Sequence, residues 1–482
     1  MHEPTNAPAD PTTQLQHFDF QRTTWLVGVL AFAALGVLAA VFWRERTLFS
    51  DIAFQTFLML KDGGLQIMVG RWVAAVTHVW PWLAKELGLP LAGVLQAFSL
   101  GFVLWPLAAF AVCVGWLRQW RCGLLLVFCG VFFVKDTFYW ITSELAQGLP
   151  VLCLVCAWLQ KRGEILRWFE WPVLAGLLAT LVWAHPMLAF PTVFCGLFFM
   201  LHRDEYARKW GGRGWGPQLA ALAVFAAFWV LKNKILPLNW YDAMSQERAA
   251  QIWTRFPHWF DLRANYDFLV WCWRDYWLTL PALATVFGYY FWKKNWTKLA
   301  LTASFSIGYV LLVNVSFADG DRQFYLESMY QPLAIFIGVP MLWDVLPFAR
   351  RPRLAFGLLA VVLAASLARI GTGHERWTQR LRWAENFLAE TAPRPARKLV
   401  VGESQVPMEL LGFSWGTPFE FLLLSALEHP DSARCLIVAP DPAALQPAMS
   451  EKRLLLGDKN FRFATFPKQY FNPQDTSAYV FY

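Results

Sequence analysis

Long apolar runs separated by short polar segments dominate this chain. A membrane-spanning helix needs about 20 apolar residues, fewer where it is kinked or packed inside protein. Runs 122–134 and 171–184 are too short to span unaided, and Pro186 and Pro191 break the stretch 171–201 into two helices that meet at a bend. The pattern predicts eleven spans, at 24–43, 91–117, 122–134, 143–159, 171–184, 187–201, 218–236, 276–292, 299–315, 332–347 and 354–370.

The composition excludes several classes of protein. Of 482 residues, 57% are hydrophobic and 16% are charged, whereas a soluble domain carries about 25% charged residues. The 28 tryptophans suit membrane–water interfaces. A soluble enzyme, a disordered chain and a disulfide-stapled secreted domain are therefore excluded, and the fold class is an α-helical polytopic membrane protein. Residues 24–43 lack a small-residue cleavage site, so we expect a retained first helix.

Basic residues indicate the orientation. With the N-terminus inside, the inner segments hold 16 Lys and Arg in 66 residues, and the outer segments hold 11 in 112. The positive-inside rule then predicts a cytoplasmic N-terminus and an extracytoplasmic C-terminus. The net charge of +8 reflects this bias. We expect no nucleic-acid partner, because no long basic run is suited to follow phosphates.

Three further regions do not read as spans. Residues 1–23 are polar and rich in Pro and Thr, which predicts a disordered cytoplasmic tail. The outer segments 51–85 and 237–275 are apolar but interrupted, and we expect helices that lie in the membrane interface. Six tryptophans between 237 and 277 favour an interfacial belt, and stacking against a sugar ring is the alternative.

The composition changes after residue 370. Residues 371–482 predict a small extracytoplasmic α/β domain with an accessory or docking role. It has no phosphate-loop glycines, no metal-spaced His and Cys residues and no Ser-His-Asp order. The expected helices are 374–390, 417–427 and 442–456, and the expected strands are Lys398–Gly402, Arg434–Ala439, Arg462–Phe466 and Ala478–Tyr482.

Cysteine and histidine spacing predicts no cofactor. Cys153 and Cys156 have a redox-motif spacing but lie within an apolar run, so we expect packed thiols. The histidines are scattered and form no ligand set, and spacing supports no divalent metal.

Asp51 is the first candidate for chemistry, because charges beside a membrane are costly and tend to be functional. It follows the first span closely, in TLFSDIAFQTF. The alternative is structural: Ser50 or Asp51 caps the helix that begins there.

A first span followed at once by an outer-loop Asp, interfacial helices, many spans and an extracytoplasmic C-terminal domain resembles the GT-C superfamily of membrane glycosyltransferases. The sharpest part of the resemblance is FSDIAFQTFLMLKDGGLQIMVGRWVAAVTHVWPWLAKELGLPL, and the likeness in architecture covers 24–370. It implies a bacterial inner-membrane enzyme that uses a polyprenyl-phosphate sugar as donor at the outer face. A single Asp stands here rather than an adjacent acidic pair, which departs from a metal-assisted version.

The resemblance implies roles for individual residues. Asp51 would accept the proton of the acceptor hydroxyl. Arg71, His185 and Arg322 would bind the lipid phosphate, and Glu144 would bind acceptor hydroxyls.

Each of these binding residues also has a structural explanation as the alternative. Arg71 would extend its side chain from an interfacial helix to solvent, and His185 would form a structural hydrogen bond at a helix break. Glu144 would cap its helix, and the nearby acids Asp319, Asp321 and Glu327 would neutralise Arg322.

Two other functions remain open. A transporter or flippase would place charges at mid-membrane, and a non-catalytic envelope assembly protein would use its C-terminal domain as a receptor. Under the enzyme hypothesis the partners are membrane lipid, the donor, and a glycan, lipid or protein acceptor.

Overall fold

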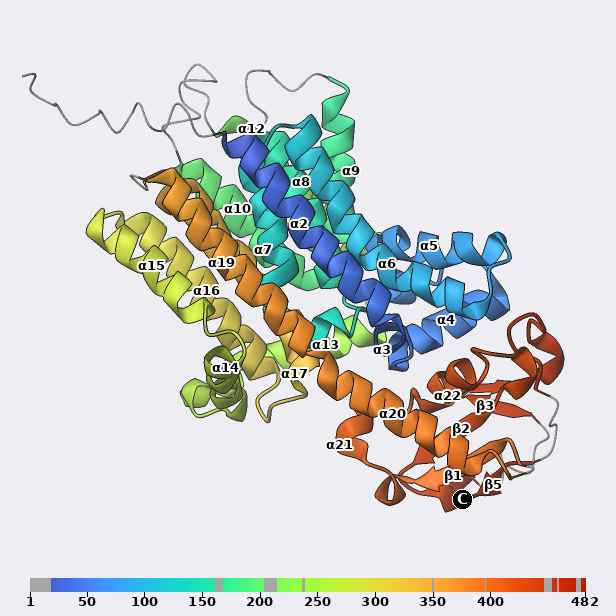
Figure 1. Cartoon of the computed structure of the whole chain (residues 1–482). Helices are drawn as coiled ribbons and strands as arrows, with labels where there is room; N and C mark the ends of the chain where they lie inside the picture. Colours follow the sequence, from blue (N-terminus) through green and yellow to red (C-terminus); the bar gives the residue numbers. More distant parts are fainter. Residues whose placement is uncertain are drawn as a thin grey trace, which may run out of the picture.

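A computed structural model shows a long helical bundle with a smaller α/β part at one end (Figure 1). It describes residues 19–160, 168–202, 215–235, 239–348, 351–394, 396–445, 453–456, 459–473 and 478–482.

Five helices are long and apolar enough to cross a membrane, judged by length and composition. The last of these continues from α19 (Pro352–Thr372) directly into α20 (His374–Thr391), which carries the chain from the bundle into the C-terminal part (Figure 1). The five apolar stretches are Phe20–Val41 (α2), Leu91–Trp116 (α6 and a following turn), Gly216–Ile235 (α12), Trp296–Ser316 (α16) and Arg353–Thr391.

Each of the other six apolar runs contains a shorter helix. The break at Pro186 is confirmed, because a 3₁₀ turn at Pro186–Leu188 separates α9 from α10, and Pro191 lies in the first turn of α10. The count of eleven spans stays a prediction. The shorter helices are α7 (Trp120–Val131), α8 (Glu144–Leu159), α9 (Glu170–Val182), α10 (Ala189–Leu201), α15 (Thr279–Trp292) and α18 (Leu333–Pro340).

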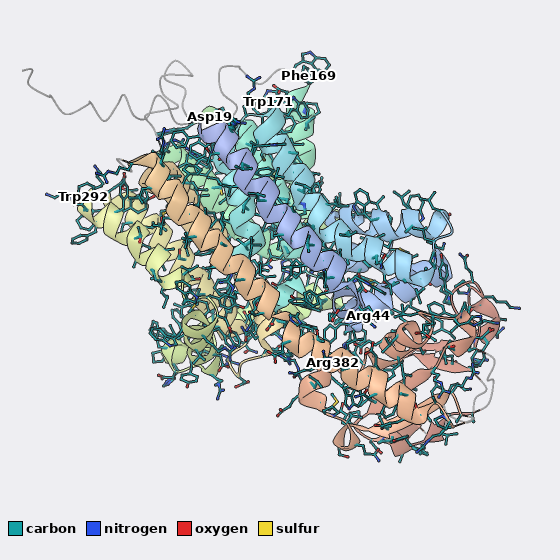
Figure 2. The ribbon with its side chains drawn as sticks, viewed as in Figure 1. Asp19, Arg44, Phe169, Trp171, Trp292 and Arg382 are labelled. Carbon is teal, nitrogen blue, oxygen red and sulfur yellow. The ribbon has the colours of Figure 1, made fainter. Side chains whose placement is uncertain are left out.

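The two ends of the bundle differ. Asp19, Phe169, Trp171 and Trp292 lie at one end, and Arg44 and Arg382 lie toward the other (Figure 2). The first end gathers segments that the basic residues assign to the cytoplasm. Which end is cytoplasmic stays a prediction.

The segment after the first span begins with α4 (Ser50–Asp62) and ends with α5 (Ala75–Glu86). The chain between these two helices is interrupted, as its sequence indicates. Gly63, Gly64 and Gly70 have positive φ, and only two 3₁₀ turns, at Met68–Gly70 and Trp72–Ala74, precede α5. Left-handed backbone interrupts a helix, and glycine adopts it at little cost.

Helices α13 (Trp240–Thr254) and α14 (Arg263–Arg274) form the second of the predicted interfacial segments. Three of their four tryptophans point outward, with Trp240 73%, Trp253 78% and Trp273 83% exposed, and Trp271 is buried. Exposed indole rings at an end of an apolar bundle suit the membrane–water interface.

The C-terminal part contains a parallel sheet in the order β2-β1-β5. Its strands are β1 (Lys398–Gly402), β2 (Cys435–Ala439) and β5 (Val480–Phe481), so three expected strands are confirmed within one or two residues. Helix α20 confirms the expected helix at 374–390, and α22 (Thr417–Ser425) confirms the one at 417–427.

Two other predictions for this part are wrong. The strand is Lys459–Phe461 (β4) rather than Arg462–Phe466, because β4 pairs antiparallel with Leu454–Leu456 (β3) and this register sets where it begins. The helix over 442–456 is replaced by a 3₁₀ turn at Pro442–Leu445 and by β3, and 446–452 lie outside the described residues. Pro442 and Pro447 disfavour a continuous helix there.

Helix α4 shares a hydrophobic core with the C-terminal part. Phe57 is fully buried, and its ring centroid lies 5.3–5.8 Å from those of Phe419, Phe461, Phe466 and Phe471. The C-terminal part therefore packs directly on the helix that carries Asp51.

Candidate functional site

Asp51 lies in the first turn of α4 but does not cap it. The N-cap residue is Phe49, and no side chain of the capping residue satisfies the helix N-terminus. Instead, the indole Nε1 of Trp140 donates a hydrogen bond of 3.3 Å to Asp51 Oδ2. The Asp51 side chain is partly exposed. Asp51 is therefore not the N-cap residue, and its carboxylate, which also accepts from its own backbone N–H, is hydrogen-bonded to another part of the chain.

The surroundings of Asp51 change its proton affinity. Burial raises the pKa of Asp51 to about 6, the Trp140 hydrogen bond opposes this rise, and the negative charge of Glu144 adds to it. A carboxylate with this pKa is ionised at neutral pH and is more basic than an ordinary Asp. Such a group meets the requirement for a general base.

Arg71 is bound by two carboxylates. Its Nη1 lies 2.9 Å from Glu144 Oε2, and its Nη2 lies 2.8 Å from Asp242 Oδ1. All three side chains are largely buried, with 7%, 13% and 9% exposure. Burial favours the neutral form of Arg71, but the two carboxylates outweigh it and raise its pKa above the ordinary value. Arg71 does not snorkel into solvent, and Glu144 pairs with it rather than with its own helix end.

Helix α13 supplies two side chains, Asp242 and Tyr241, that contact Arg71. Asn239 caps α13 by accepting from Asp242 N at 2.8 Å, and its Nδ2 donates to Asp242 Oδ2 at 2.9 Å. The guanidinium of Arg71 lies 5.0 Å from the ring centre of Tyr241, whose hydroxyl is 2.8 Å from that of Tyr325. Tyr325 lies on α17 (Gln323–Tyr330), so α13 and α17 meet beside Arg71.

Glu327 anchors the loop that presents Trp140. Its carboxylate accepts from the backbone N–H groups of Lys135, Asp136 and Thr137, at 2.5, 3.0 and 2.9 Å. Burial and the charge of Asp136 raise the pKa of Glu327 to about 7. Hydrogen bonds to Glu327 therefore fix the loop that begins at Lys135 to α17.

His185 is buried at the start of the 3₁₀ turn before α10. Its Nδ1 accepts from Met187 N at 3.2 Å, which is the structural hydrogen bond that the sequence allowed. Burial lowers its pKa well below the ordinary value, and the positive charges of Arg71 and Lys232 lower it further. A neutral imidazole next to two cations contributes little charge to phosphate binding.

Lys232 is the cation that remains available near this cluster. Its Nζ donates to the backbone carbonyl of Val182 at 3.1 Å. Within the described part of the chain, no carboxylate lies within ion-pair distance of it. Its charge is thus not cancelled by direct pairing, unlike that of Arg71.

Arg322 makes its contacts with the C-terminal part rather than with the other four candidates. Its guanidinium contacts the backbone carbonyls of Met408 and Glu409 at 3.5 Å, in the C-terminal part. Arg376 donates to the same Glu409 carbonyl at 3.1 Å. Asp321 accepts the backbone N–H of Arg322, and no acid in the described ranges forms an ion pair with its guanidinium.

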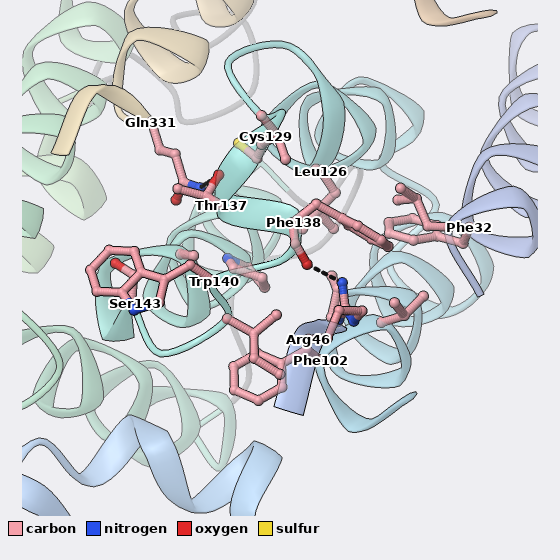
Figure 3. A pocket seen from close by; sticks show the side chains of 18 residues that line it. Phe32, Arg46, Phe102, Leu126, Cys129, Thr137, Phe138, Trp140, Ser143 and Gln331 are labelled. Carbon is pink, nitrogen blue, oxygen red and sulfur yellow. Dashed lines mark hydrogen bonds between the residues drawn. The ribbon is translucent and has the colours of Figure 1, made fainter. Parts of the chain in front are cut away.

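A mostly apolar cavity of about 110 Å³ lies behind Trp140 (Figure 3). Arg46 lines it, fully buried, and donates to Phe138 O and, at 2.8 Å, to Ser99 Oγ. Trp140 belongs both to this cavity and to the hydrogen bond with Asp51. The other lining side chains come mainly from α2, α6, α7 and α8.

Among the residues that the structure describes, no three His, Cys, Asp or Glu side chains are arranged to hold a metal ion. Sequence reasoning missed Trp140, Asp242, Tyr241 and Tyr325. The Asn-x-x-Asp spacing at 239–242 is a helix-start signal, but it gives no indication of a partner at Arg71.

No known protein-family profile matches this chain, and no curated protein matches it. Among solved structures, the chain is similar to the crystal structure of ArnT from Cupriavidus metallidurans bound to undecaprenyl phosphate. The identity is 15%, 88% of each chain is covered, and the TM-score is 0.42.

Proposed function

We propose that this protein is a membrane glycosyltransferase that transfers a sugar from a polyprenyl phosphate at the end of the bundle where α4, α13 and the C-terminal part meet. The donor class follows from the resemblance of the sequence to GT-C enzymes. Asp51 is the general base, and the reaction inverts the anomeric carbon.

The observation that carries the proposal is the state of Asp51. The residue is partly exposed, its carboxylate accepts from Trp140 and is not the N-cap of its helix, and its pKa is raised to about 6. In the reaction, the acceptor oxygen forms a bond to the anomeric carbon and the bond from that carbon to the phosphate oxygen breaks. The acceptor proton goes to Asp51, and polyprenyl phosphate leaves with the bonding electrons.

The departing phosphate needs positive charge that is not already neutralised. Arg71 has two carboxylate partners, but its Nε has no hydrogen-bond partner in the described structure. Among the described residues, the Lys232 ammonium has only a carbonyl acceptor, that of Val182. We assign Lys232, together with the free Nε of Arg71, to the phosphate, and Glu144 to positioning Arg71.

The lipid part of the donor needs an apolar surface close to the base. The cavity behind Trp140 has mostly apolar walls and shares that residue with the Asp51 hydrogen bond. We assign this cavity to the first carbons of the prenyl chain. Pockets of this kind use a few polar groups to orient an apolar ligand.

The decisive experiment supplies membranes that contain the protein with polyprenyl-phosphate sugars radiolabelled in the sugar. Wild-type membranes are expected to transfer label to an acceptor, and membranes with Asp51→Asn are expected to lose transfer. Matched membranes with Asp62→Asn, at the opposite end of α4, control for a carboxylate lost from the same helix. Transfer that survives Asp51→Asn would show that the base is assigned wrongly.

A further inference from the structure

The residues directly before Asp51 are enclosed by two side chains of the C-terminal part. Arg380 of α20 donates from Nη1 to Leu48 O at 3.1 Å and from Nε to Leu411 O at 3.2 Å. Its guanidinium also lies 4.6 Å from the ring centre of Phe49 and forms an ion pair with Glu420 of α22. Arg380 thereby joins the backbone before Asp51 to the C-terminal part.

Glu420 supplies the cap that α4 lacks. Its Oε1 accepts from Ser50 N at 2.6 Å, and Ser50 is the first residue of the helix. The first N–H groups of a helix have no partner within the helix, so an acceptor from elsewhere must satisfy them. Glu420 and Arg380 are 3% and 5% exposed, so solvent competes little for these bonds.

The backbone at this contact is strained. Ser50 has φ +32°, although it is not glycine. Such a conformation is unfavourable for a residue with a side chain and persists only where the surroundings impose it. Gly416 allows the close contact with Ser50, because a Cβ added at position 416 would lie 2.6 Å from Ser50 Cα. The C-terminal part therefore approaches Ser50 more closely than a larger residue at position 416 would allow.

We propose that Glu420 is a positioning residue for Asp51, so that the C-terminal part sets the place of the general base as well as packing against the bundle. This inference rests on the proposed function. Glu420 accepts the backbone N–H of Ser50. Arg380 donates to Leu48 O and pairs with Glu420, and Gly416 leaves room for the strained Ser50. Together they fix the first turn of α4, from which the Asp51 carboxylate reaches Trp140.

The first test measures hydrogen exchange of the α4 N-terminus in the full-length protein and needs no activity. In Glu420→Ala, the amides of residues 50–53 are expected to exchange about tenfold faster or more, because a buried acceptor is lost. Glu420→Gln retains an acceptor oxygen and is expected to keep most of the protection. Glu385→Ala is the control, because it removes an exposed pair with Arg44 that also joins the two parts.

The second test measures labelled sugar transfer by the same variants. Glu420→Ala is expected to lower kcat about tenfold or more with the donor KM within about twofold, because a misplaced base slows the chemical step rather than binding. Gly416→Ala is expected to do the same through the contact with Ser50. Gly402→Ala is its control, since a Cβ there would lie no closer than 3.4 Å to any atom.

The pH dependence separates positioning from a general loss of structure. The groups whose charges act on Asp51 are Glu144 and Glu420, with Trp140 as hydrogen-bond donor. Removing the charge of Glu420 in Glu420→Gln is expected to move the acidic limb of the transfer profile to lower pH. A purely structural effect would reduce the amount of active protein and leave the profile unmoved.

The outcomes distinguish this inference from the proposed function. If Glu420→Ala exchanges and reacts like Glu385→Ala, positioning by the C-terminal part is wrong, whatever the reaction. If the exchange result is obtained but Asp51→Asn transfers normally, Glu420 caps α4 and the assignment of the base is wrong.

Discussion

The backbone N–H of Ser50 donates to the carboxylate of Glu420 over 2.6 Å, across a sequence separation of 370 residues. The residue after Ser50 is Asp51, whose own carboxylate is free to accept from Trp140. Glu420, rather than Asp51, therefore accepts the first N–H group of α4.

The first prediction concerns pH. Asp51 must be ionised to accept a proton, and its pKa is raised to about 6, so kcat/KM is expected to rise with pH and level off above about 7. At pH 5, one unit below this pKa, transfer is expected to be about tenfold below the plateau. The measurement is the initial rate of labelled transfer at low donor concentration across this range. A profile that is flat from pH 5 to 8 would contradict the role of Asp51.

The second prediction concerns the hydrogen bond from Trp140. Trp140→Phe keeps an aromatic ring but removes the N–H that stabilises the ionised carboxylate. The acidic limb of the profile is therefore expected to move to higher pH. Trp343→Phe is the matched control, because Trp343 Nε1 donates to Gln160 Oε1 at 2.7 Å, away from Asp51. Equal profiles for the two variants would show that the Trp140 bond does not tune the base.

Hydropathy and periodicity predicted the helices well, because each apolar run reflects a local requirement to bury or face lipid. The Asp51–Trp140 and Arg71–Asp242 contacts are different, since they join residues 89 and 171 positions apart. No local pattern marks such partners. The sequence predicted that Asp51, Arg71 and Glu144 lie on the same side of the membrane, but it did not predict their hydrogen bonds.

The wrong predictions for the strand in the C-terminal part and for the surroundings of Arg322 also result from partners that no local pattern marks. The antiparallel pairing of β3 with β4 decides where β4 begins, and a pairing register is not visible in the composition of Arg462–Phe466. Arg322 shares an outer loop with three acids in sequence, but its guanidinium reaches the carbonyls of Met408 and Glu409. Local charge counting therefore misjudged its surroundings.

The third prediction concerns the stability of the ion-pair cluster. Arg71→Ala leaves the buried carboxylates of Glu144 and Asp242 without their cation, and removing one partner of a buried pair costs about 3–5 kcal/mol. The thermal midpoint in detergent is expected to fall clearly. Arg44→Ala breaks the exposed pair with Glu385 and is expected to cost about 0–1 kcal/mol. Similar midpoints for the two variants would show that the cluster adds no more than a surface pair.

The fourth prediction concerns the anchor of the Trp140 loop. Glu327→Ala removes the shared acceptor of three backbone N–H groups, those of Lys135, Asp136 and Thr137. Each buried donor left unsatisfied costs about 1–3 kcal/mol. Faster hydrogen exchange over residues 135–141 is expected, together with slower transfer, because Trp140 is then held less firmly. Glu247→Ala on the exposed face of α13 is the control, and unchanged exchange in Glu327→Ala would contradict the anchoring role.

The same carboxylate gives the stability a pH dependence of defined sign. Burial raises the pKa of Glu327 from 4.5 to about 7, so the folded protein binds a proton there that the unfolded chain releases at lower pH. That contribution is present below about pH 4.5 and is lost as the pH rises to about 7. The difference in thermal midpoint between wild type and Glu327→Ala is therefore expected to narrow from pH 5 to pH 8. A difference that widens over this range would mean that the three N–H donors keep Glu327 ionised.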